Sequence, residues 1–112
     1  MKTKIFCDIA DYKTIKVFNN KAIVDGFTTN PSLMRLAGAK NYKDYSLNIL
    51  KVCNKKSISF EVFSDNPSDM LKQAYIINSW GKNVYVKIPV VNSKGVFMGP
   101  VIKKLSDKGI KL

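Results

Sequence analysis

The hydrophobic and polar positions of the chain fall into two alternating patterns. Short apolar runs rich in β-branched and aromatic residues predict strands at Lys4 to Ile9, Ala22 to Thr29, Ser57 to Phe63 and Asn83 to Val90. Apolar residues at helical spacing, with Asn-Pro starts and Gly stops, predict helices at 11–20, 30–38, 41–53, 66–80 and from about Phe97 to Gly109. The last residues, 110–112, have the character of a fifth strand at its start.

Repeated alternation of strand and helix is typical of a parallel α/β sheet in a single domain. Such strands are covered by helices, which agrees with their nearly continuous apolar runs. Two architectures fit, namely an open doubly wound sheet and a (β/α)₈ barrel. A barrel needs roughly 200 residues or more, and the chain has 112. The sequence therefore predicts either a complete small open sheet or about half a barrel.

The composition restricts the chemistry that the chain can perform. It has no histidine, which excludes His-based acid/base catalysis, Ser-His-Asp triads and most zinc sites. Cys7 and Cys53 lack CxxC spacing, and we expect both to be small buried thiols in a reducing compartment. Any catalysis must then use carboxylates, lysine, hydroxyls or amides, and we expect neither a metal nor a cofactor.

The net charge of +11 raises the question of a nucleic-acid partner. The lysines are scattered in ones and twos, and Arg35 is the one arginine, although base and phosphate recognition often relies on arginine. We favour a solvated lysine surface, then attraction for phosphorylated metabolites, and nucleic acid only third. No apolar run reaches the ~18 residues of a membrane span, and Asp8 interrupts the N-terminal apolar run, so we expect a cytoplasmic protein.

Polar residues stand at the carboxyl end of each predicted strand, where parallel α/β folds gather their functional groups. They are Asp8, the Thr28 to Asn30 segment, Glu61 and Lys87. Because side chains alternate between faces, these groups can share one face and converge. The opposite faces should pack under helices, and they carry Ile5 and Cys7, Phe60 and Val62, and Val86 and Ile88.

Each of these polar residues also has a structural interpretation. Asp8 could cap the first helix, although Asp11 is better placed to do so, and Glu61 could be a solvated edge residue. Asn30 opens an ordinary helix-start signal, and Lys87 could protect an exposed edge strand from aggregation. Since polar groups follow four separate strands, we favour a shared functional site.

A lysine facing inward among carboxylates suggests covalent catalysis. Burial disfavours the charged form of an amine, and a neutral amine can attack a carbonyl to form a Schiff base. Retro-aldol cleavage of the resulting iminium needs a general base and a group that moves protons. Asp8 and Glu61 suit these roles, while Asn30 and Thr28 could orient substrate hydroxyls.

The quoted strand ends also resemble a known family. In their order and spacing, "KIFCDIAD", "VDGFTTNPSL", "ISFEV" and "VYVKIPV" are similar to the transaldolase family, in particular its small bacterial branch that includes fructose 6-phosphate aldolase. The similarity covers the whole chain. One departure is Ile9, where the family more often has a hydroxyl residue; its side chain should face the helices.

The resemblance implies a role for each candidate. Lys87 would be the Schiff-base lysine and Asp8 the acid/base acting on the donor hydroxyl, while Glu61 would handle protons through a water molecule. Asn30 and Thr28 would line the sugar pocket. Glu61 favours transfer of a dihydroxyacetone unit between phosphorylated sugars, as in the pentose phosphate pathway, because free aldolases of the family have Gln there.

The resemblance further implies that residues 1–112 are the N-terminal half of an eight-stranded barrel, ending before the fifth strand. A half barrel leaves strand edges unpaired and its interior wet, so we expect weak or no activity from this chain alone. A self-associating half barrel is less favoured, and a full-length chain should be a homo-oligomer. The alternatives are a fructose 6-phosphate aldolase-like lyase and a non-catalytic basic α/β module that binds phosphorylated ligands or RNA.

Overall fold

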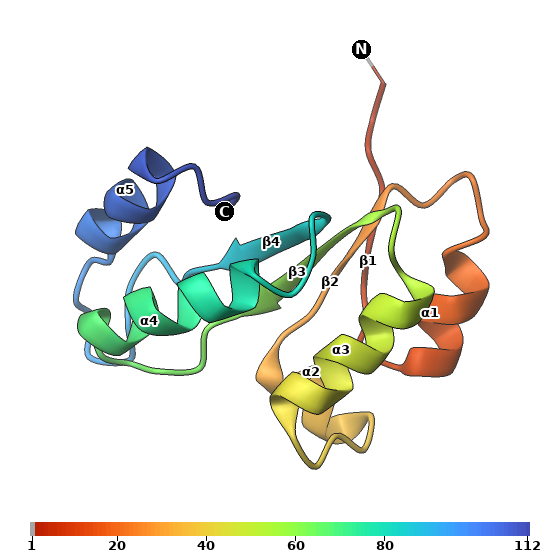
Figure 1. Ribbon diagram of the computed structural model, residues 1–112, viewed down its shortest axis with the longest axis horizontal. Helices are drawn as coiled ribbons and strands as arrows, with labels where there is room; N and C mark the ends of the chain where they lie inside the picture. The colour runs from red at the N-terminus through yellow and green to blue at the C-terminus, as the bar shows by residue number, and fades with distance from the viewer. Residues whose placement is uncertain (1) are drawn as a thin grey trace. The chain divides into compact units, whose positions relative to one another are not determined.

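The computed structural model describes residues 2–112, in which strands alternate with helices (Figure 1). The elements are β1 (Phe6–Asp8), α1 (Tyr12–Phe18), β2 (Gly26–Thr28), α2 (Pro31–Leu36), α3 (Tyr42–Val52), β3 (Ser57–Glu61), α4 (Pro67–Asn78), β4 (Val84–Lys87) and α5 (Gly99–Asp107). The strands form one sheet in the order β1-β2-β3-β4, and β2 pairs in parallel with β1 and with β3. This confirms the predicted α/β class and its succession of β/α units.

The chain divides into two compact units, Met1–Ser59 and Phe60–Leu112. In the first unit the register aligns Cys7 with Phe27 and Phe27 with Ile58. Its fully buried core comes from α1, β2, α2, α3 and β3, namely Ile15, Phe27, Met34, Ile49, Cys53 and Ile58. Helices α1 and α3 contact each other, as do α2 and α3. The predicted amphipathic helices therefore bury apolar residues in a core shared with the strands.

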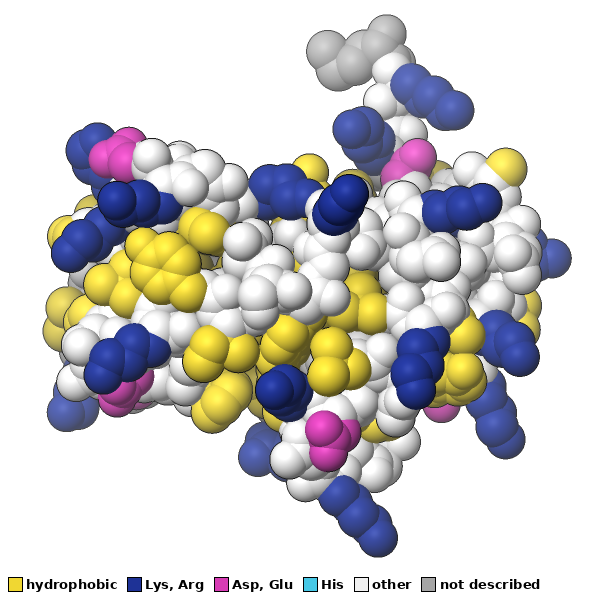
Figure 2. Space-filling model, in the orientation of Figure 1, with side chains coloured by type: hydrophobic (Ala, Val, Ile, Leu, Met, Phe, Trp, Pro, Cys, Tyr) yellow, Lys and Arg dark blue, Asp and Glu magenta, His cyan; other side chains and the backbone are white. Residues whose placement is uncertain are grey.

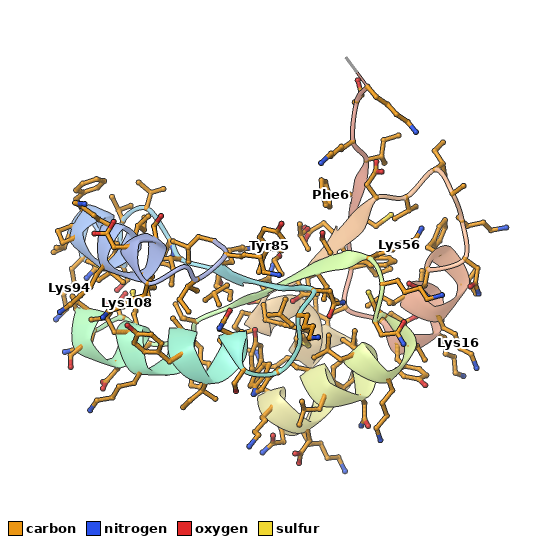
Figure 3. The ribbon with its side chains drawn as sticks, turned by 45° about the horizontal axis from the view of Figure 1, so that its top comes forward. Phe6, Lys16, Lys56, Tyr85, Lys94 and Lys108 are labelled. Carbon is orange, nitrogen blue, oxygen red and sulfur yellow. The ribbon has the colours of Figure 1, made fainter. Side chains whose placement is uncertain are left out.

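Strand β2 is shorter than the predicted run from Ala22, because residues 21–25 form a turn. The Val24 amide donates to the Lys21 carbonyl at 3.1 Å, and Lys56 Nζ donates to the carbonyls of Phe18, Lys21 and Val24, the last at 2.6 Å (Figure 3). This lysine comes from the segment before β3, far along the sequence, so the local pattern could not reveal the turn that it holds.

The second unit has its own core around α4, β4 and α5. Its buried residues are Phe60, Val62, Met70, Ala74, Ile77, Val84, Val86, Met98, Val101, Leu105 and Ile110. The rings of Phe60 and Trp80 meet edge to face with centroids 5.7 Å apart. The amide of Val86 donates to the Lys111 carbonyl at 2.8 Å, so the end of the chain lies beside β4, where a fifth strand is expected to start.

The helix boundaries follow the sequence signals. Asp11 caps α1 by accepting from the Thr14 amide at 3.0 Å, which assigns the cap to Asp11 rather than Asp8. Asn66 caps α4, and Pro67 is its first residue. Gly109 has a φ of +77° just after α5, a left-handed conformation that glycine adopts at low cost.

Predicted faces and surfaces are only partly correct. Phe60, Val62 and Val86 are buried as expected, whereas Ile5 is 44% exposed and Cys7 is only partly buried. Ile5 lies just before β1, and its carbonyl accepts a hydrogen bond from the Asp25 amide, just outside the paired residues of β1 and β2.

Lys and Arg side chains are scattered over the face in Figure 2 rather than gathered in one patch. Within residues 2–112, no helix is both long and apolar enough to cross a membrane.

Candidate active site

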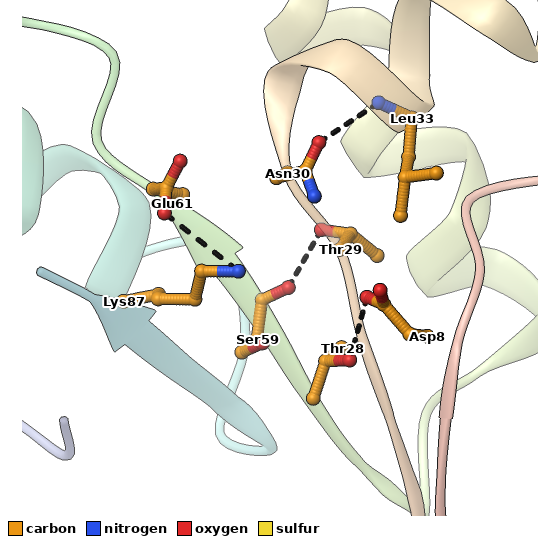
Figure 4. Close-up of polar contacts among 8 residues, drawn as sticks. All are labelled: Asp8, Thr28, Thr29, Asn30, Leu33, Ser59, Glu61 and Lys87. Atoms are coloured by element: carbon orange, nitrogen blue, oxygen red, sulfur yellow. Dashed lines mark hydrogen bonds and ion pairs between the residues drawn. The ribbon is translucent and has the colours of Figure 1, made fainter. Parts of the chain in front are cut away.

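Lys87 and Glu61 form an ion pair at the carboxyl ends of β4 and β3. Lys87 Nζ lies 3.6 Å from Glu61 Oε2 (Figure 4). The strand alternates as predicted, because Val84 and Val86 are fully buried while Tyr85 and Lys87 lie on the other face. The Val62 amide donates to the Lys87 carbonyl at 3.2 Å and joins the ends of the two strands.

Within residues 2–112, the side chain of Lys87 is less buried than we expect of a Schiff-base nucleophile. Its side chain is 38% exposed and that of Glu61 is 27% exposed. Such a pair contributes only about 0–1 kcal/mol to stability, because water screens it and both long side chains lose freedom. The contact therefore serves to orient the two groups more than to stabilise the fold.

Asp8 and Thr28 form a second polar pair at the ends of β1 and β2. The parallel register aligns Asp8 with Thr28, and Thr28 Oγ1 donates to Asp8 Oδ1 at 2.8 Å (Figure 4). The hydroxyl of Thr28 donates to one carboxylate oxygen, and Oδ2 of Asp8 accepts no bond from it. Asp8 itself is exposed.

Asn30 caps helix α2, as its helix-start motif predicts. Its Oδ1 accepts from the Leu33 amide at 2.8 Å and caps α2, with Pro31 as the first helical residue (Figure 4). The cap uses only the carbonyl oxygen, so the cap also fixes the direction of the side-chain NH₂ group. The capping role and a role in substrate binding are therefore compatible.

Thr29 is a positioning residue that sequence reasoning left without a role of its own. It is fully buried, and its Oγ1 and its amide both donate to the Ser59 carbonyl, at 2.7 and 3.2 Å. These bonds fasten the end of β2 to β3. The Ser59 hydroxyl is buried and has no hydrogen-bond partner among the described residues. In the sequence, the one indication of a role for Ser59 is that it lies on the same face of β3 as Glu61.

The structure thus brings the candidates together as two pairs, Asp8 with Thr28 in the first unit and Glu61 with Lys87 in the second. Convergence of all of them on one centre stays a prediction. A group of three or more His, Cys, Asp or Glu side chains suited to a metal ion does not occur in the described part of the chain.

A family model described as transaldolase/fructose-6-phosphate aldolase matches residues 5–112. The chain belongs to this family. A probable transaldolase of Dehalococcoides mccartyi is 36% identical over 108 residues, which are 96% of this chain and 48% of the relative. A probable transaldolase of Nitrosopumilus maritimus is 39% identical over 107 residues, which are 96% of this chain and 46% of the relative. That of Herpetosiphon aurantiacus is 34% identical over 108 residues, again 96% of this chain and 46% of the relative.

The transaldolase family membership agrees with the sheet. The chain spans about half the length of the curated relatives that it matches. A sheet in the order β1-β2-β3-β4 with alternating helices is what part of a (β/α)₈ barrel contains. Of the two architectures left open by the pattern, the partial barrel is therefore favoured over the complete open sheet.

Proposed function

We propose that this chain carries the Schiff-base half of a transaldolase, which moves a dihydroxyacetone unit between phosphorylated sugars in the pentose phosphate pathway. The observation that carries the proposal is the pairing of Lys87 Nζ with Glu61 Oε2 at 3.6 Å, at the carboxyl ends of neighbouring strands in a transaldolase-family chain. A nucleophile beside a proton-accepting group is the arrangement that imine formation requires.

The proposed reaction begins when the neutral amine of Lys87 attacks the ketose carbonyl. The carbinolamine loses water to give an iminium, with Glu61 accepting and returning protons through a water molecule. Asp8 then takes the proton of the hydroxyl on the far carbon of the C–C bond that breaks, the carbon that becomes the aldehyde of the departing product. The electrons of that C–C bond move into the iminium and leave an enamine on Lys87, and an aldose phosphate departs. A second aldose phosphate accepts the enamine carbon, and hydrolysis frees Lys87.

Hydrogen bonds described above support the roles of the other residues. Thr28 orients Asp8 by donating to its Oδ1, and the cap on α2 orients the amide of Asn30, which we assign to a substrate hydroxyl. Binding energy from such oriented groups lowers the barrier by holding the reacting atoms in place. No cofactor enters the proposed steps.

We further propose that residues 1–112 are the N-terminal half of the barrel and that alone they are weakly active or inactive. Lys87 is 38% exposed, so water reaches the position where the iminium forms and can hydrolyse it. In the full-length protein, which we expect to be a cytoplasmic homo-oligomer, the remaining strands would cover this position.

Reductive trapping tests the proposal. The chain is incubated with fructose 6-phosphate and sodium borohydride, and adducts are located by peptide mass spectrometry. We expect a low yield of adduct that is concentrated at Lys87 and absent from Lys87→Met. Lys103 is the matched control, because it also pairs with a carboxylate, Asp107, at 3.0 Å, but on the exposed surface of α5. Equal labelling of Lys103 would contradict the Schiff-base proposal, and near-stoichiometric labelling of Lys87 would contradict inactivity.

The family description also covers fructose-6-phosphate aldolase, so a free lyase is the second candidate. It would use the same lysine but release its product without an acceptor. Turnover with and without an aldose phosphate separates the two, because a transaldolase needs the acceptor and a lyase does not. The non-catalytic alternative predicts salt-dependent oligonucleotide binding that Lys87→Ala leaves unchanged.

A further inference from the structure

The strands that carry Glu61 and Lys87 are each followed by an ordered loop. Residues 88–98 after β4 contain a small hairpin, in which Val91 and Phe97 form an antiparallel bridge. The Asn92 amide donates to the Val96 carbonyl at 2.9 Å, and the Met98 amide donates to the Val90 carbonyl at 2.7 Å. Gly95, with a φ of +77°, permits the reversal of the chain.

This hairpin is tied to the loop after β3 by Asp65. One carboxylate oxygen, Oδ1, accepts from the Ser93 amide at 2.8 Å, and the other, Oδ2, accepts from the Ser93 hydroxyl at 2.6 Å. The Asn92 side-chain amide donates to the Asp65 carbonyl at 3.2 Å. We call these three bonds the Asp65 clamp. The two bonds from Ser93 lower the pKa of the Asp65 carboxyl, with the Ser93 hydroxyl contributing most, and so favour the ionised form.

The clamp joins two segments that are already braced. In the hairpin, Asn92 Oδ1 accepts from the amides of Lys94 and Val96 at 3.0 and 2.9 Å. On the other side, Gln73 Oε1 from α4 accepts from the amides of Phe63 and Ser64 at 2.9 and 3.0 Å. A bond between two ordered segments transmits position, because neither segment can yield without breaking its own bonds.

Apolar packing holds the hairpin at its base, where Met98 is fully buried, but not along its length. Val90, Val91, Val96 and Phe97 are each more than half exposed. The hydrogen bonds of the clamp connect this exposed part of the hairpin to the loop after β3. Next to the ion pair, the two strand ends are joined by the hydrogen bond from the Val62 amide to the Lys87 carbonyl. The clamp adds a second connection, between the loops that follow the same two strands.

We propose that Asp65 is a positioning residue for Lys87, which fixes the separation of the strand ends that carry Glu61 and Lys87 by gripping Ser93. The catalytic part of this proposal, the positioning of Lys87 for reaction, rests on the proposed function. The structural part, the fixed separation of the two strand ends, does not depend on it. The clamp orients the ion pair in the way that a supporting shell orients catalytic groups, without touching the substrate.

Amide hydrogen exchange of the chain tests the structural consequence. Asp65→Ala should accelerate exchange of the Val62 and Ser93 amides by about tenfold, since charge-assisted hydrogen bonds are lost. Ser93→Ala should have a smaller effect at the same amides, and Ser93→Thr should restore protection by supplying the hydroxyl. The Thr29 amide, which bonds to Ser59 in the first unit, is the internal reference. Asp107→Asn is the matched control and should change none of these amides.

Borohydride trapping with fructose 6-phosphate tests the catalytic consequence. Asp65→Ala should slow adduct formation at Lys87 by about tenfold and Ser93→Ala by less. Ser93→Thr keeps the hydroxyl and should form adduct at the wild-type rate. Unchanged exchange at Val62 in Asp65→Ala would overturn the proposal. So would Lys87 trapping at the wild-type rate in that variant. If the wild-type chain forms no adduct, the chain alone is inactive, and the exchange of the Val62 amide alone decides the role of Asp65.

Discussion

The two polar pairs are held by different means. Asp8 accepts from a neutral hydroxyl at 2.8 Å, and the register of two paired strands places these residues directly opposite each other. Glu61 meets a cation at 3.6 Å, through the long and partly exposed side chain of Lys87. In the proposed mechanism, the short, bonded carboxylate of Asp8 suits a general base. The long side chain of Lys87 lets the proposed nucleophile move with a bound substrate while its strand end stays fixed.

The largest expected effect comes from removing the carboxylate of the second pair. Glu61→Ala removes the carboxylate that accepts protons during imine formation and leaves no amide in its place. We expect trapping at Lys87 to slow by about 10²-fold or more, with little change in the midpoint of urea unfolding, because the pair is partly exposed. Rapid-quench trapping measures the rate. An unchanged rate would remove Glu61 from the mechanism.

Gly26→Ala should disturb the first pair and spare the second. A Cβ at Gly26 would lie 2.5 Å from the ring of Phe6 and 2.6 Å from the backbone oxygen of Ser57, which cannot move aside as a flexible side chain can. We expect a loss of roughly 1–3 kcal/mol in the free energy of unfolding, measured by urea denaturation. Stability equal to wild type would show that β1 and β2 do not need this close approach.

The neighbouring threonines offer a smaller and sharper contrast. Thr29→Val removes a donor to the Ser59 carbonyl from a fully buried position, and should cost about 1–2 kcal/mol of stability. Thr28→Val removes the donor to the exposed Asp8 carboxylate, and should cost less than about 1 kcal/mol. Urea denaturation of both variants gives the comparison. The reverse order of costs would contradict the assignment of Thr29 to structure and Thr28 to the site.

Cys7 and Cys53 should differ in their rates of alkylation. Burial raises the pKa of the Cys53 thiol from 9.0 to about 11, whereas Cys7 is partly exposed. With iodoacetamide at pH 8, we expect Cys7 to be alkylated well before Cys53. The raised pKa also means that Cys53 favours the folded state below pH 9.0 and that this contribution disappears as the pH rises through 11. Equal alkylation rates would contradict the burial of Cys53.

Local signals in the sequence were sufficient for the helix caps and for the alternation on β4. Asp11, Asn30 and Asn66 cap helices because short polar side chains reach the first free amides, a rule that needs only neighbouring residues. The alternation of buried Val84 and Val86 with Tyr85 and Lys87 follows from the two-residue period of a strand.

Contacts between distant residues could not be predicted in the same way. Lys56 shortens β2 by binding carbonyls more than 30 positions earlier, and Asp65 grips Ser93 across 28 positions. The alignment of Asp8 with Thr28 depends on strand register, which the apolar pattern of β1 does not specify, since Phe6 is exposed and Ile5 is too.

The central claim is that Lys87 is the nucleophile, and site-resolved trapping tests it most directly. The ratio of borohydride-fixed fructose 6-phosphate adduct at Lys87 to that at Lys103 is measured by quantitative peptide mass spectrometry on the same sample. The proposed chemistry predicts a ratio far above one, which falls toward one when Glu61 is replaced by Ala. A ratio near one in the wild-type chain would show that Lys87 reacts as an ordinary surface amine and would contradict the claim.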